Sequence, residues 1–308
     1  MGTPEFGVPC LDLMVKSGYK PVLCISQPDR PKGRKKLLQP TPIKIKAEEL
    51  GIKVAQPEDV NDPIFLEELE RLNPDVIVTV AYGGYLKKKI RKLPKYGCLN
   101  LHPSLLPLYR GSAPINFTLF NNDTKTGVTI FKIVAKMDAG PILLQSETEI
   151  LPEDNFTSLS EKLSIQGAKA TIKALQLLEL GEVKYLEQDH NLATFSNKIF
   201  KEDMFIDWSK PASEIRNLIR GLAEYPAATA AFRGKRIKII EVELKEKNSN
   251  SPFGTILEVI KNKGILVAGN ENDILIKKVQ PAGKKIMSAH AFNLGARINI
   301  GETFENGF

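Results

Sequence analysis

The stretch that decides the fold runs Gly97-Cys98-Leu99-Asn100-Leu101-His102-Pro103-Ser104-Leu105-Leu106-Pro107. Its first half alternates, so Asn100 and His102 project from one face of an extended chain while the leucines beside them project from the other. Pro103 ends the alternation. The stretch therefore predicts a strand whose end carries an Asn and a His side by side, at the edge where a parallel sheet opens its crevice.

A long turn follows this strand and continues through Arg110-Gly111-Ser112-Ala113-Pro114. Pro-rich loops of this length are more often functional than structural. Further along, Met137-Asp138-Ala139-Gly140-Pro141 places a carboxylate on a second turn between two apolar segments. An isolated Asn-x-His pattern is more typical of a strand cap bonded to a neighbouring loop, but the two turns together favour a reaction site.

The three polar side chains suit the transfer of an acyl group to an amine. The Asn100 amide can donate to an oxyanion, and an imidazolium at His102 would do so more strongly. Asp138 beside His102 would favour the charged form of the imidazole and hold its orientation, or take a proton from the attacking ammonium. Cys98 and Ser104 have no second histidine beside them, so a covalent acyl-enzyme is the weaker alternative.

The pattern Asn-x-His-Pro-Ser-Leu-Leu-Pro with a downstream Asp-Ala-Gly resembles the folate-dependent formyltransferases and their hydrolase relatives. The extended form Ser-Leu-Leu-Pro-Leu-Tyr-Arg-Gly-Ser-Ala-Pro-Ile resembles the methionyl-tRNA formyltransferases in particular, and the likeness covers the chain from Gly2 onward. This resemblance implies 10-formyltetrahydrofolate as co-substrate, no metal, and formylation of initiator methionyl-tRNA for translation initiation.

The resemblance also implies roles for individual residues. The catalytic residues would be Asn100, His102 and Asp138. The folate would lie against Ser104, Leu105, Leu106 and Pro107, with Tyr82 and Gly83 near the pterin. The acceptor stem of the tRNA would be contacted by Arg30, Lys32, Arg34, Lys35 and Lys36. A Pro-Ala-Gly turn that presents Lys284 and Lys285 fits further phosphate contacts.

Two basic clusters point to a polyanionic partner without reference to any family. Seven Lys or Arg residues stand against one acid between Gln27 and Lys46, and six stand against none between Lys87 and Lys95. Such clusters are commonly solvated faces, but two of them on a chain with a formal net charge of +7 favour a nucleic acid as the partner.

The chain departs from the family pattern at Lys35, where Gly is usual, at residues 84–87 on the folate rim, and at residues 224–226.

Strand and helix alternate up to Leu180, which predicts a doubly wound, mostly parallel α/β domain over residues 1–181. The resemblance implies that this domain is of the Rossmann-like formyltransferase type. Its basic segment from Gln27 to Lys36 is expected to be loop, and its last helix to begin with a capping box at Ser158-Leu159-Ser160-Glu161. Residues 182–204 are polar and irregular, a predicted linker. Residues 205–308 show one helix and then strands only, which predicts a small OB-like β-barrel, a type that usually binds nucleic acid. The resemblance implies that this domain binds tRNA.

Composition narrows the class of protein further. No apolar run approaches the ~20 residues of a membrane span, and the first residues lack a basic and an apolar targeting region, so we expect a cytoplasmic protein. We also expect the protein to be a monomer. Three cysteines in apolar segments suit buried free thiols. With three histidines and no Cys-x-x-Cys, no protein-bound metal is expected. His190 and His290 are expected at the surface.

The beginning of the chain carries a separate expectation. A doubly wound domain normally opens with a buried strand that feeds the first helix, whereas Met1-Gly2-Thr3-Pro4 matches the turn that follows this strand in the family. We expect no strand before the helix at Pro9, and an empty central position between the strands at Val22 and at Asp75 or Cys98. We further expect a working protein with ~5 to 8 residues before Met1.

Three other functions stay open. The chain could formylate a small amine, such as a nucleotide precursor or a nucleotide-linked amino sugar, or it could be a folate hydrolase domain that releases formate. It could also be an RNA-binding protein with a decayed α/β domain. The intact Asn100, His102 and Asp138 argue against the last alternative. The basic loop and the second domain argue against a small-amine enzyme, which needs neither.

Overall fold

The computed structural model describes residues 1–32, 37–247 and 250–307. The chain forms two compact units. The first holds residues 1–114, 125–150 and 160–196, and the second holds residues 115–124, 151–159 and the chain from Asn197 onward. The segment 182–204, expected as a linker, is therefore divided, because its first part up to Ser196 packs with the first unit.

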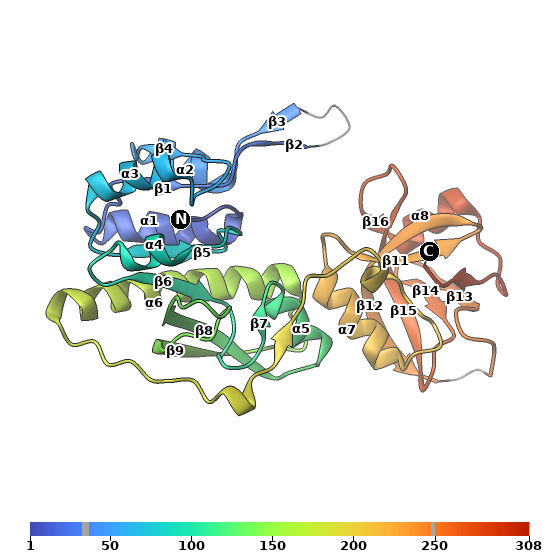
Figure 1. The fold of residues 1–308 in the computed structure, drawn as a ribbon. Helices are drawn as coiled ribbons and strands as arrows, with labels where there is room; N and C mark the ends of the chain where they lie inside the picture. Colours follow the sequence, from blue (N-terminus) through green and yellow to red (C-terminus); the bar gives the residue numbers. More distant parts are fainter. Residues whose placement is uncertain (33–36, 248–249, 308) are drawn as a thin grey trace. The chain divides into compact units, whose positions relative to one another are not determined.

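The first unit is built on a mixed sheet. Its strands follow the order β5-β6-β8-β9, with β5 and β6 parallel and the other pairs antiparallel (Figure 1). A separate two-stranded parallel piece pairs β1 with β4. The bounds are β1 (Cys24–Ile25), β4 (Val54–Ala55), β5 (Ile77–Val80), β6 (Cys98–His102), β8 (Lys125–Lys132) and β9 (Ile142–Glu149).

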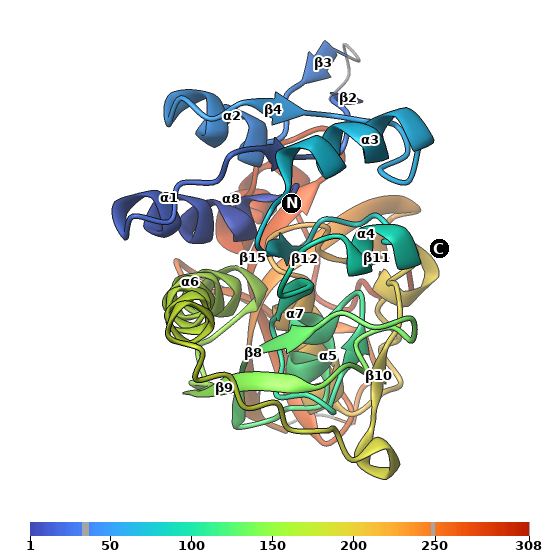
Figure 2. The same cartoon turned by 60° about the vertical axis from the view of Figure 1, so that its left-hand side comes forward.

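Helices cover both faces of these strands, which confirms a mixed α/β unit. Helices α1 and α6 lie on one side and α3 and α4 on the other (Figure 2), and α2 packs against α1. The bounds are α1 (Val8–Lys16), α2 (Pro42–Glu49), α3 (Pro63–Leu72), α4 (Lys88–Lys92) and α6 (Phe156–Leu180). A one-turn 3₁₀ helix, η1 (Glu5–Gly7), leads into α1.

Strand β6 has the two faces that its alternation predicts. On one side the Cys98 thiol donates to the Ile90 carbonyl of α4 at 3.6 Å. On the other side Leu101 meets α6 at Gly167, where an added Cβ would lie 2.6 Å from the leucine side chain. Asn100 and His102 alternate with the leucines, so they belong to the face that carries Cys98.

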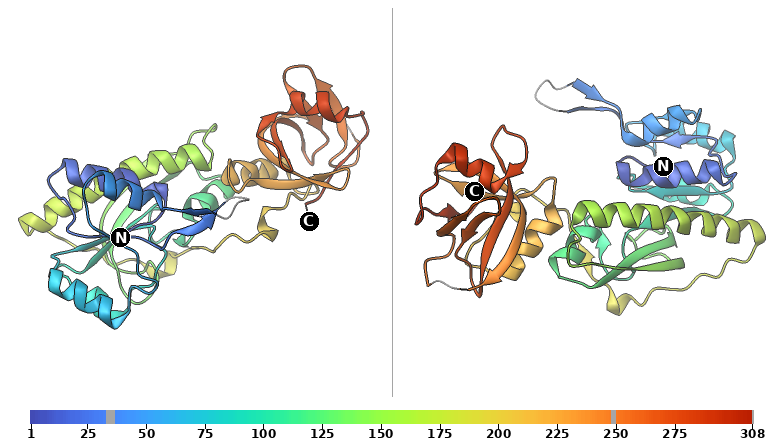
Figure 3. Two further views of the ribbon diagram at one scale, coloured as in Figure 1. Left: turned by 90° about the horizontal axis from the view of Figure 1, so that it is seen from above. Right: turned by 180° about the vertical axis from the view of Figure 1, so that it is seen from behind.

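The segment expected to be loop from Gln27 to Lys36 contains a strand, so that expectation is wrong. Strand β2 (Arg30–Lys32) pairs antiparallel with β3 (Leu37–Gln39), as Figures 1 and 3 show. Pro31 is tolerated because each strand of a two-stranded ribbon is an edge strand, with one side free of ladder bonds. The residues between the strands, Gly33 to Lys36, lie outside the described residues.

Helix α6 begins two residues before the predicted capping box. The N-cap is Asn155, whose Oδ1 atom accepts from the Ser158 amide at 3.0 Å, while the Ser158 hydroxyl accepts from the Asn155 amide at 3.1 Å. Ser158 is therefore the third residue of the helix and closes the box instead of opening it. The sequence pattern located the motif but misplaced its register by three residues.

The second unit is an antiparallel sheet in the order β13-β14-β15-β12-β11-β17, with β16 beside β15. A bridge between Thr255 and Thr303 joins the two ends of this order, so the sheet curls toward a barrel. The bounds are β11 (Ala228–Phe232), β12 (Lys235–Glu246), β13 (Ile256–Ile260), β14 (Gly264–Val267), β15 (Asn272–Pro281), β16 (Met287–Ser288) and β17 (Phe304–Glu305).

Helices complete the second unit. Helix α7 (Ala212–Leu222) buries Ile215 and Ile219 in the core of the sheet. The expectation of strands only after α7 is wrong, because α8 (Ala289–Ala296) follows β16. The Ser288 hydroxyl caps α8 by accepting from the Ala291 amide at 3.1 Å, and this N-cap serine is the local signal that was overlooked. Two further short helices are α5 (Pro114–Phe120), most of which lies in this unit, and η3 (Glu202–Met204), whereas η2 (His190–Leu192) lies in the first unit.

The expected arrangement at the beginning of the chain is confirmed. Among the described residues no strand precedes α1, and β1 and β5 are not paired with each other. Met1 and Gly2 lie between them, with the Gly2 amide donating to the Ile25 carbonyl at 2.9 Å and the Val80 amide donating to the Met1 carbonyl at 2.9 Å. Cys10, Cys24 and Cys98 are buried free thiols, as expected. None of the described helices combines the length and apolar character that crossing a membrane requires.

Candidate active site

The site is organised around the end of β6, beside the end of β5. The register pairs Asn100 with Thr79 of β5. The Thr79 hydroxyl donates to the Asn100 Oδ1 atom at 2.6 Å, which fixes the side-chain amide in one orientation. Within the described chain the Asn100 Nδ2 group makes no hydrogen bond. An oriented N–H donor without a partner therefore stands at the carboxyl edge of the sheet.

His102 ends the same strand and is nearly enclosed. Its side chain is 5% exposed, and its Nε2 atom lies 2.9 Å from the Tyr109 carbonyl. A carbonyl only accepts, so Nε2 carries a hydrogen and donates to it. Burial lowers the pKa of His102, and it outweighs the opposing effects of the Asp138 carboxylate and of the Tyr109 bond. The resting imidazole is neutral, with its free lone pair on Nδ1.

Asp138 sits on the turn between β8 and β9, with its backbone in the left-handed region at φ 49°. Asp tolerates this region better than most residues. The turn closes tightly at Gly140, where an added Cβ would lie 1.8 Å from the Lys132 carbonyl oxygen. The glycine of the Asp-Ala-Gly motif is therefore needed for the close approach of two backbones.

The carboxylate of Asp138 is aimed at His102. Its Oδ2 atom accepts from the Gly111 amide at 2.8 Å and lies 3.8 Å from His102 Nδ1. That separation is too long for a direct hydrogen bond. The structure therefore brings His102 and Asp138 close together, as expected. Asn100 lies on the same strand as His102, two residues before it.

Two details of the expected chemistry are corrected. Asp138 was expected to favour the charged form of His102, but burial outweighs the carboxylate and lowers the pKa of the imidazole. Asp138 was expected to hold the imidazole in place, but the Tyr109 carbonyl does so through Nε2. The charge of Asp138 still favours the protonated imidazole, so the carboxylate stabilises the charged form once His102 has taken up a proton.

Arg110 is a member of the site to which sequence reasoning assigned no role. Arg110 as a whole is 1% exposed, and its Nε and Nη2 atoms donate to the Gln188 Oε1 atom at 3.1 and 2.7 Å. Nη2 also lies 2.8 Å from His190 Nδ1. Burial lowers the pKa of Arg110, and the Asp138 carboxylate opposes this shift. The local signal that could have identified Arg110 is a single charged residue, between Tyr109 and Gly111, in the turn that follows the strand of the site.

Gln188 ties this cation to the turn that holds Asp138. Its Nε2 group donates to the Asp138 carbonyl at 2.9 Å and to the Gly140 carbonyl at 2.7 Å. It comes from the stretch that was expected to be a linker. In the same stretch β10 (Phe195–Ser196) pairs with β7 (Arg110–Gly111). This stretch is therefore part of the frame of the site. His190 is exposed, as expected, whereas His290 is half-buried, against expectation.

Some of the residues expected to contact the folate have buried side chains, and others are half-buried. The Ser104 hydroxyl donates to the Leu108 carbonyl at 2.6 Å, and Leu106 packs on Phe131, so both side chains are buried. Leu105 and Pro107 are half-buried. Tyr82 is buried among α3 and α4, and burial raises its pKa to about 12. Gly83 follows it at the end of β5, with φ 82°.

The structure describes only some of the basic residues that were expected to contact the tRNA. Arg30 lies on β2 and pairs with Glu58 at 3.0 Å. Lys284 and Lys285 are exposed in the turn after β15. Lys32 belongs to β2, but its side chain is outside what the structure describes, as are Arg34, Lys35 and Lys36 altogether.

Both units match models of one family. The model described as formyl transferase matches residues 1–175, and the model described as formyl transferase, C-terminal domain, matches residues 198–297. The chain belongs to the formyltransferase family. It is 43% identical to the methionyl-tRNA formyltransferase of Bacillus cytotoxicus, over 98% of this chain and 96% of that protein. The methionyl-tRNA formyltransferase of Bacillus subtilis is 40% identical, over 98% and 95%.

Solved structures repeat the fold at much lower identity. HypX from Aquifex aeolicus, in complex with tetrahydrofolic acid, has a TM-score of 0.65 and 14% identity over 95% of this chain and 46% of its own. An N-formyltransferase from Helicobacter canadensis, in complex with folinic acid and dTDP-3-aminofucose, has a TM-score of 0.67 and 20% identity over 89% and 96%. These likenesses establish the fold alone.

Proposed function

We propose that this chain transfers a formyl group from 10-formyltetrahydrofolate to the amino group of initiator methionyl-tRNA, in the cytoplasm, for translation initiation. The observation that carries the proposal is the pairing of a buried, neutral His102 with Asp138 at the end of the strand that presents the Asn100 amide. Relatives at 40% and 43% identity that bear the name methionyl-tRNA formyltransferase support this choice of acceptor.

The geometry supports a direct transfer. The His102 Nδ1 lone pair, with Asp138 behind it, takes the proton that the attacking amine loses as its nitrogen bonds to the formyl carbon. The Asn100 Nδ2 group donates to the oxyanion of the tetrahedral intermediate. The bond from the formyl carbon to the folate nitrogen then breaks, and His102 returns its proton to that leaving nitrogen. No atom of the enzyme becomes covalently attached.

The folate donor would lie along the edge where β5 and β6 end. Leu105 and Pro107 are the half-buried members of the expected wall, while Ser104 and Leu106 support it from inside. In the turn Ala81-Tyr82-Gly83 the two residues that flank Tyr82 have positive φ, Ala81 at 47° and Gly83 at 82°. This turn exposes backbone near Asn100, which suits a flat, polar pterin ring.

The tRNA would be held by the basic residues of both units. Arg30, Lys32, Arg34, Lys35 and Lys36 would reach the acceptor stem, and Lys284 and Lys285 would contact phosphates. We regard the first unit as a Rossmann-like, doubly wound domain and the second as an OB-like barrel. The bridge between Thr255 and Thr303 supports a closed barrel. We propose that the protein acts as a monomer without a metal.

One assay identifies the acceptor. The protein is incubated with a labelled formyl donor and total aminoacylated tRNA, and the formylated amino acid is released and identified. Parallel reactions contain a nucleotide-linked amino sugar, or no acceptor. Formylmethionine on tRNA supports the proposal. Label on the amino sugar would instead show a small-amine enzyme, and free formate without an acceptor would show a hydrolase. Asp138→Asn serves as the inactive control.

A further inference from the structure

Both members of the pair His102 and Asp138 are held by one short turn, residues 109–111. The Tyr109 carbonyl accepts from His102 Nε2 at 2.9 Å, and the Gly111 amide donates to Asp138 Oδ2 at 2.8 Å. Tyr109 has φ 58°, a region that residues other than glycine adopt only where the surroundings hold them in it. A change in the shape of this turn would therefore move both side chains and alter the 3.8 Å between them.

The turn is held in place by residues 188–196, called the clasp below. The Thr194 hydroxyl oxygen accepts from the Tyr109 amide at 2.8 Å, and the Thr194 carbonyl accepts from the Arg110 amide at 2.9 Å. The Ser196 hydroxyl donates at 3.1 Å to the Tyr109 carbonyl, the same carbonyl that holds the imidazole. The turn and the clasp both belong to the first unit.

Gln188, at the beginning of the clasp, uses every hydrogen-bonding group of its side-chain amide. Its Oε1 atom accepts two bonds from the Arg110 guanidinium, and its Nε2 group donates to the carbonyls of Asp138 and Gly140 at 2.9 and 2.7 Å. A guanidinium only donates and a carbonyl only accepts, so the amide has one orientation that satisfies all four bonds. Arg110 thus fixes which way the amide faces, and the amide fixes the turn of Asp138.

The charge of Arg110 has no acidic group beside it. Among the described residues its guanidinium forms no ion pair, its second partner is His190 Nδ1, and its Nη1 atom is buried without an acceptor. Replacing a buried ion by an apolar side chain of similar volume is often neutral or stabilising. Packing alone therefore does not explain a buried arginine here. The Asp138 carboxylate favours the charged guanidinium at longer range, by raising its pKa against the effect of burial.

We propose that Arg110 and Gln188 are positioning residues for formyl transfer, which together set the distance between the Asp138 carboxylate and His102 Nδ1. The guanidinium orients the amide, and the amide holds the turn from which the carboxylate projects. This inference rests on the proposed function, because it concerns the same reaction. Without this hold Asp138 would stabilise a proton on His102 less well. The turnover number should then fall while the binding of folate and tRNA is kept.

Gln188→Glu is the direct test. It keeps the size of the side chain and an acceptor for Arg110, but it removes both donors to the turn of Asp138. If Gln188 served only to bind the buried cation, a carboxylate would do so at least as well. We expect kcat to fall roughly tenfold or more, with the KM for folate and for tRNA changed by less than about twofold. A kcat within about twofold of the parent would overturn the proposal.

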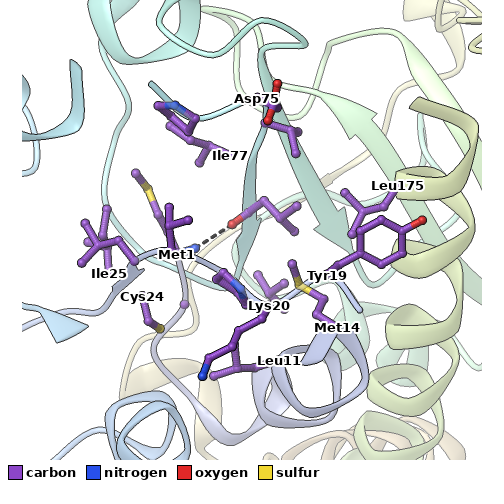
Figure 4. A pocket seen from close by; sticks show the side chains of 18 of the residues that line it. Met1, Leu11, Met14, Tyr19, Lys20, Cys24, Ile25, Asp75, Ile77 and Leu175 are labelled. Atoms are coloured by element: carbon purple, nitrogen blue, oxygen red, sulfur yellow. Dashed lines mark hydrogen bonds between the residues drawn. The ribbon is translucent and has the colours of Figure 1, made fainter. Parts of the chain in front are cut away.

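Two control variants separate positioning from a general loosening of the first unit. Gln166→Glu makes the same exchange on α6, where Nε2 donates to the Ser146 hydroxyl and the Glu147 carbonyl at 2.6 and 2.9 Å. Leu175→Val enlarges the mainly apolar cavity between β1 and β5 in Figure 4, whose described lining includes no residue of the turn or the clasp. Both should lower the melting temperature and keep the kcat of the parent. A loss of kcat in either control equal to that of Gln188→Glu would contradict the proposal.

Arg110→Lys adds a measurement that needs no turnover, and it decides the question if Gln188→Glu does not fold. Lysine keeps the positive charge but lacks the planar fork that binds Gln188 Oε1 through two nitrogens. Because Asp138 raises the pKa of His102, a loosened Asp138 should lower that pKa relative to the parent. The NMR titration of His102 measures this shift without substrates, and an unchanged value would overturn the proposal. A parent protein that formylates no tRNA would instead contradict the proposed function and leave this result intact.

Discussion

His102 Nδ1 faces the Asp138 Oδ2 atom across 3.8 Å, while His102 Nε2 is committed to the Tyr109 carbonyl. One ring nitrogen is thus fixed as a donor and the other is left as the acceptor. The carboxylate stands close enough to stabilise a proton on Nδ1 but too far to hold one permanently. The pair is arranged to accept a proton during the reaction and to release it afterwards.

The titration of His102 gives the first prediction. Its pKa should lie below the ordinary value of about 6.5, because burial disfavours the imidazolium. The unfolded chain would take up this proton nearer pH 6.5, so stability should fall as the pH drops below that value. With three histidines in the chain, the NMR titration of His102 can be resolved. A pKa above 6.5 would contradict the assignment of burial as the dominant cause.

Asp138→Asn tests the role of the carboxylate. Formyl transfer should fall by roughly 100-fold or more, because the proton on His102 loses its stabilising charge. The pKa of His102 should fall further in this variant, since Asp138 raises it in the parent. His102→Ala should lose activity to a similar degree, with the circular dichroism spectrum retained. Near-normal turnover in either folded variant would show that the assigned mechanism is wrong.

Thr79→Val tests the orientation of Asn100. The substitution keeps the shape of the side chain and removes the hydroxyl that donates to Asn100 Oδ1, so the amide is free to turn. We expect kcat to fall roughly tenfold, with stability changed by about 1 kcal/mol. The control is Thr118→Val, whose buried hydroxyl has no partner among the described residues. An equal kcat in the two variants would show that Thr79 does not orient Asn100 for catalysis.

Gly111→Ala tests the link between the turn at Arg110 and Asp138. Gly111 has φ 125°, and an added Cβ would lie 2.3 Å from the Ser196 carbonyl oxygen. The methyl group would push β7 from β10 and displace the amide that holds Asp138. We expect a loss of about 1 to 3 kcal/mol of stability and lower activity. Gly295→Ala in α8 meets nothing within 4 Å and should be tolerated.

Arg34→Ala tests the basic loop, on the sequence argument alone because Arg34 lies outside the described residues. The KM for tRNA should rise and folate affinity should stay unchanged. The slope of log affinity against log salt should become shallower by about one, because one phosphate contact is lost. Lys261→Ala, in the turn between β13 and β14, is the matched control of equal charge change. Weaker folate binding with normal tRNA kinetics would reverse the assignment.

The sequence by itself determined the centre of the site. Alternation over five residues was enough to predict β6 with Asn100 and His102 on one face, and Asp-Ala-Gly was enough to predict the turn at Asp138. The same motifs indicated the family, and the hydrophobic periodicity indicated the order of most strands and helices. These features depend on local periodicity and on short motifs, which a single sequence displays directly.

Only the tertiary structure decided how the site is charged and supported. His102 is neutral because segments far apart in the chain enclose it, and no local pattern states the depth of burial. Arg110 finds Gln188 across 78 residues of chain, within a stretch whose composition indicated a linker. Ser104 and Leu106 turned inward because their turn packs on β8. Long-range packing set each of these outcomes, because burial and contact depend on neighbours that periodicity does not identify.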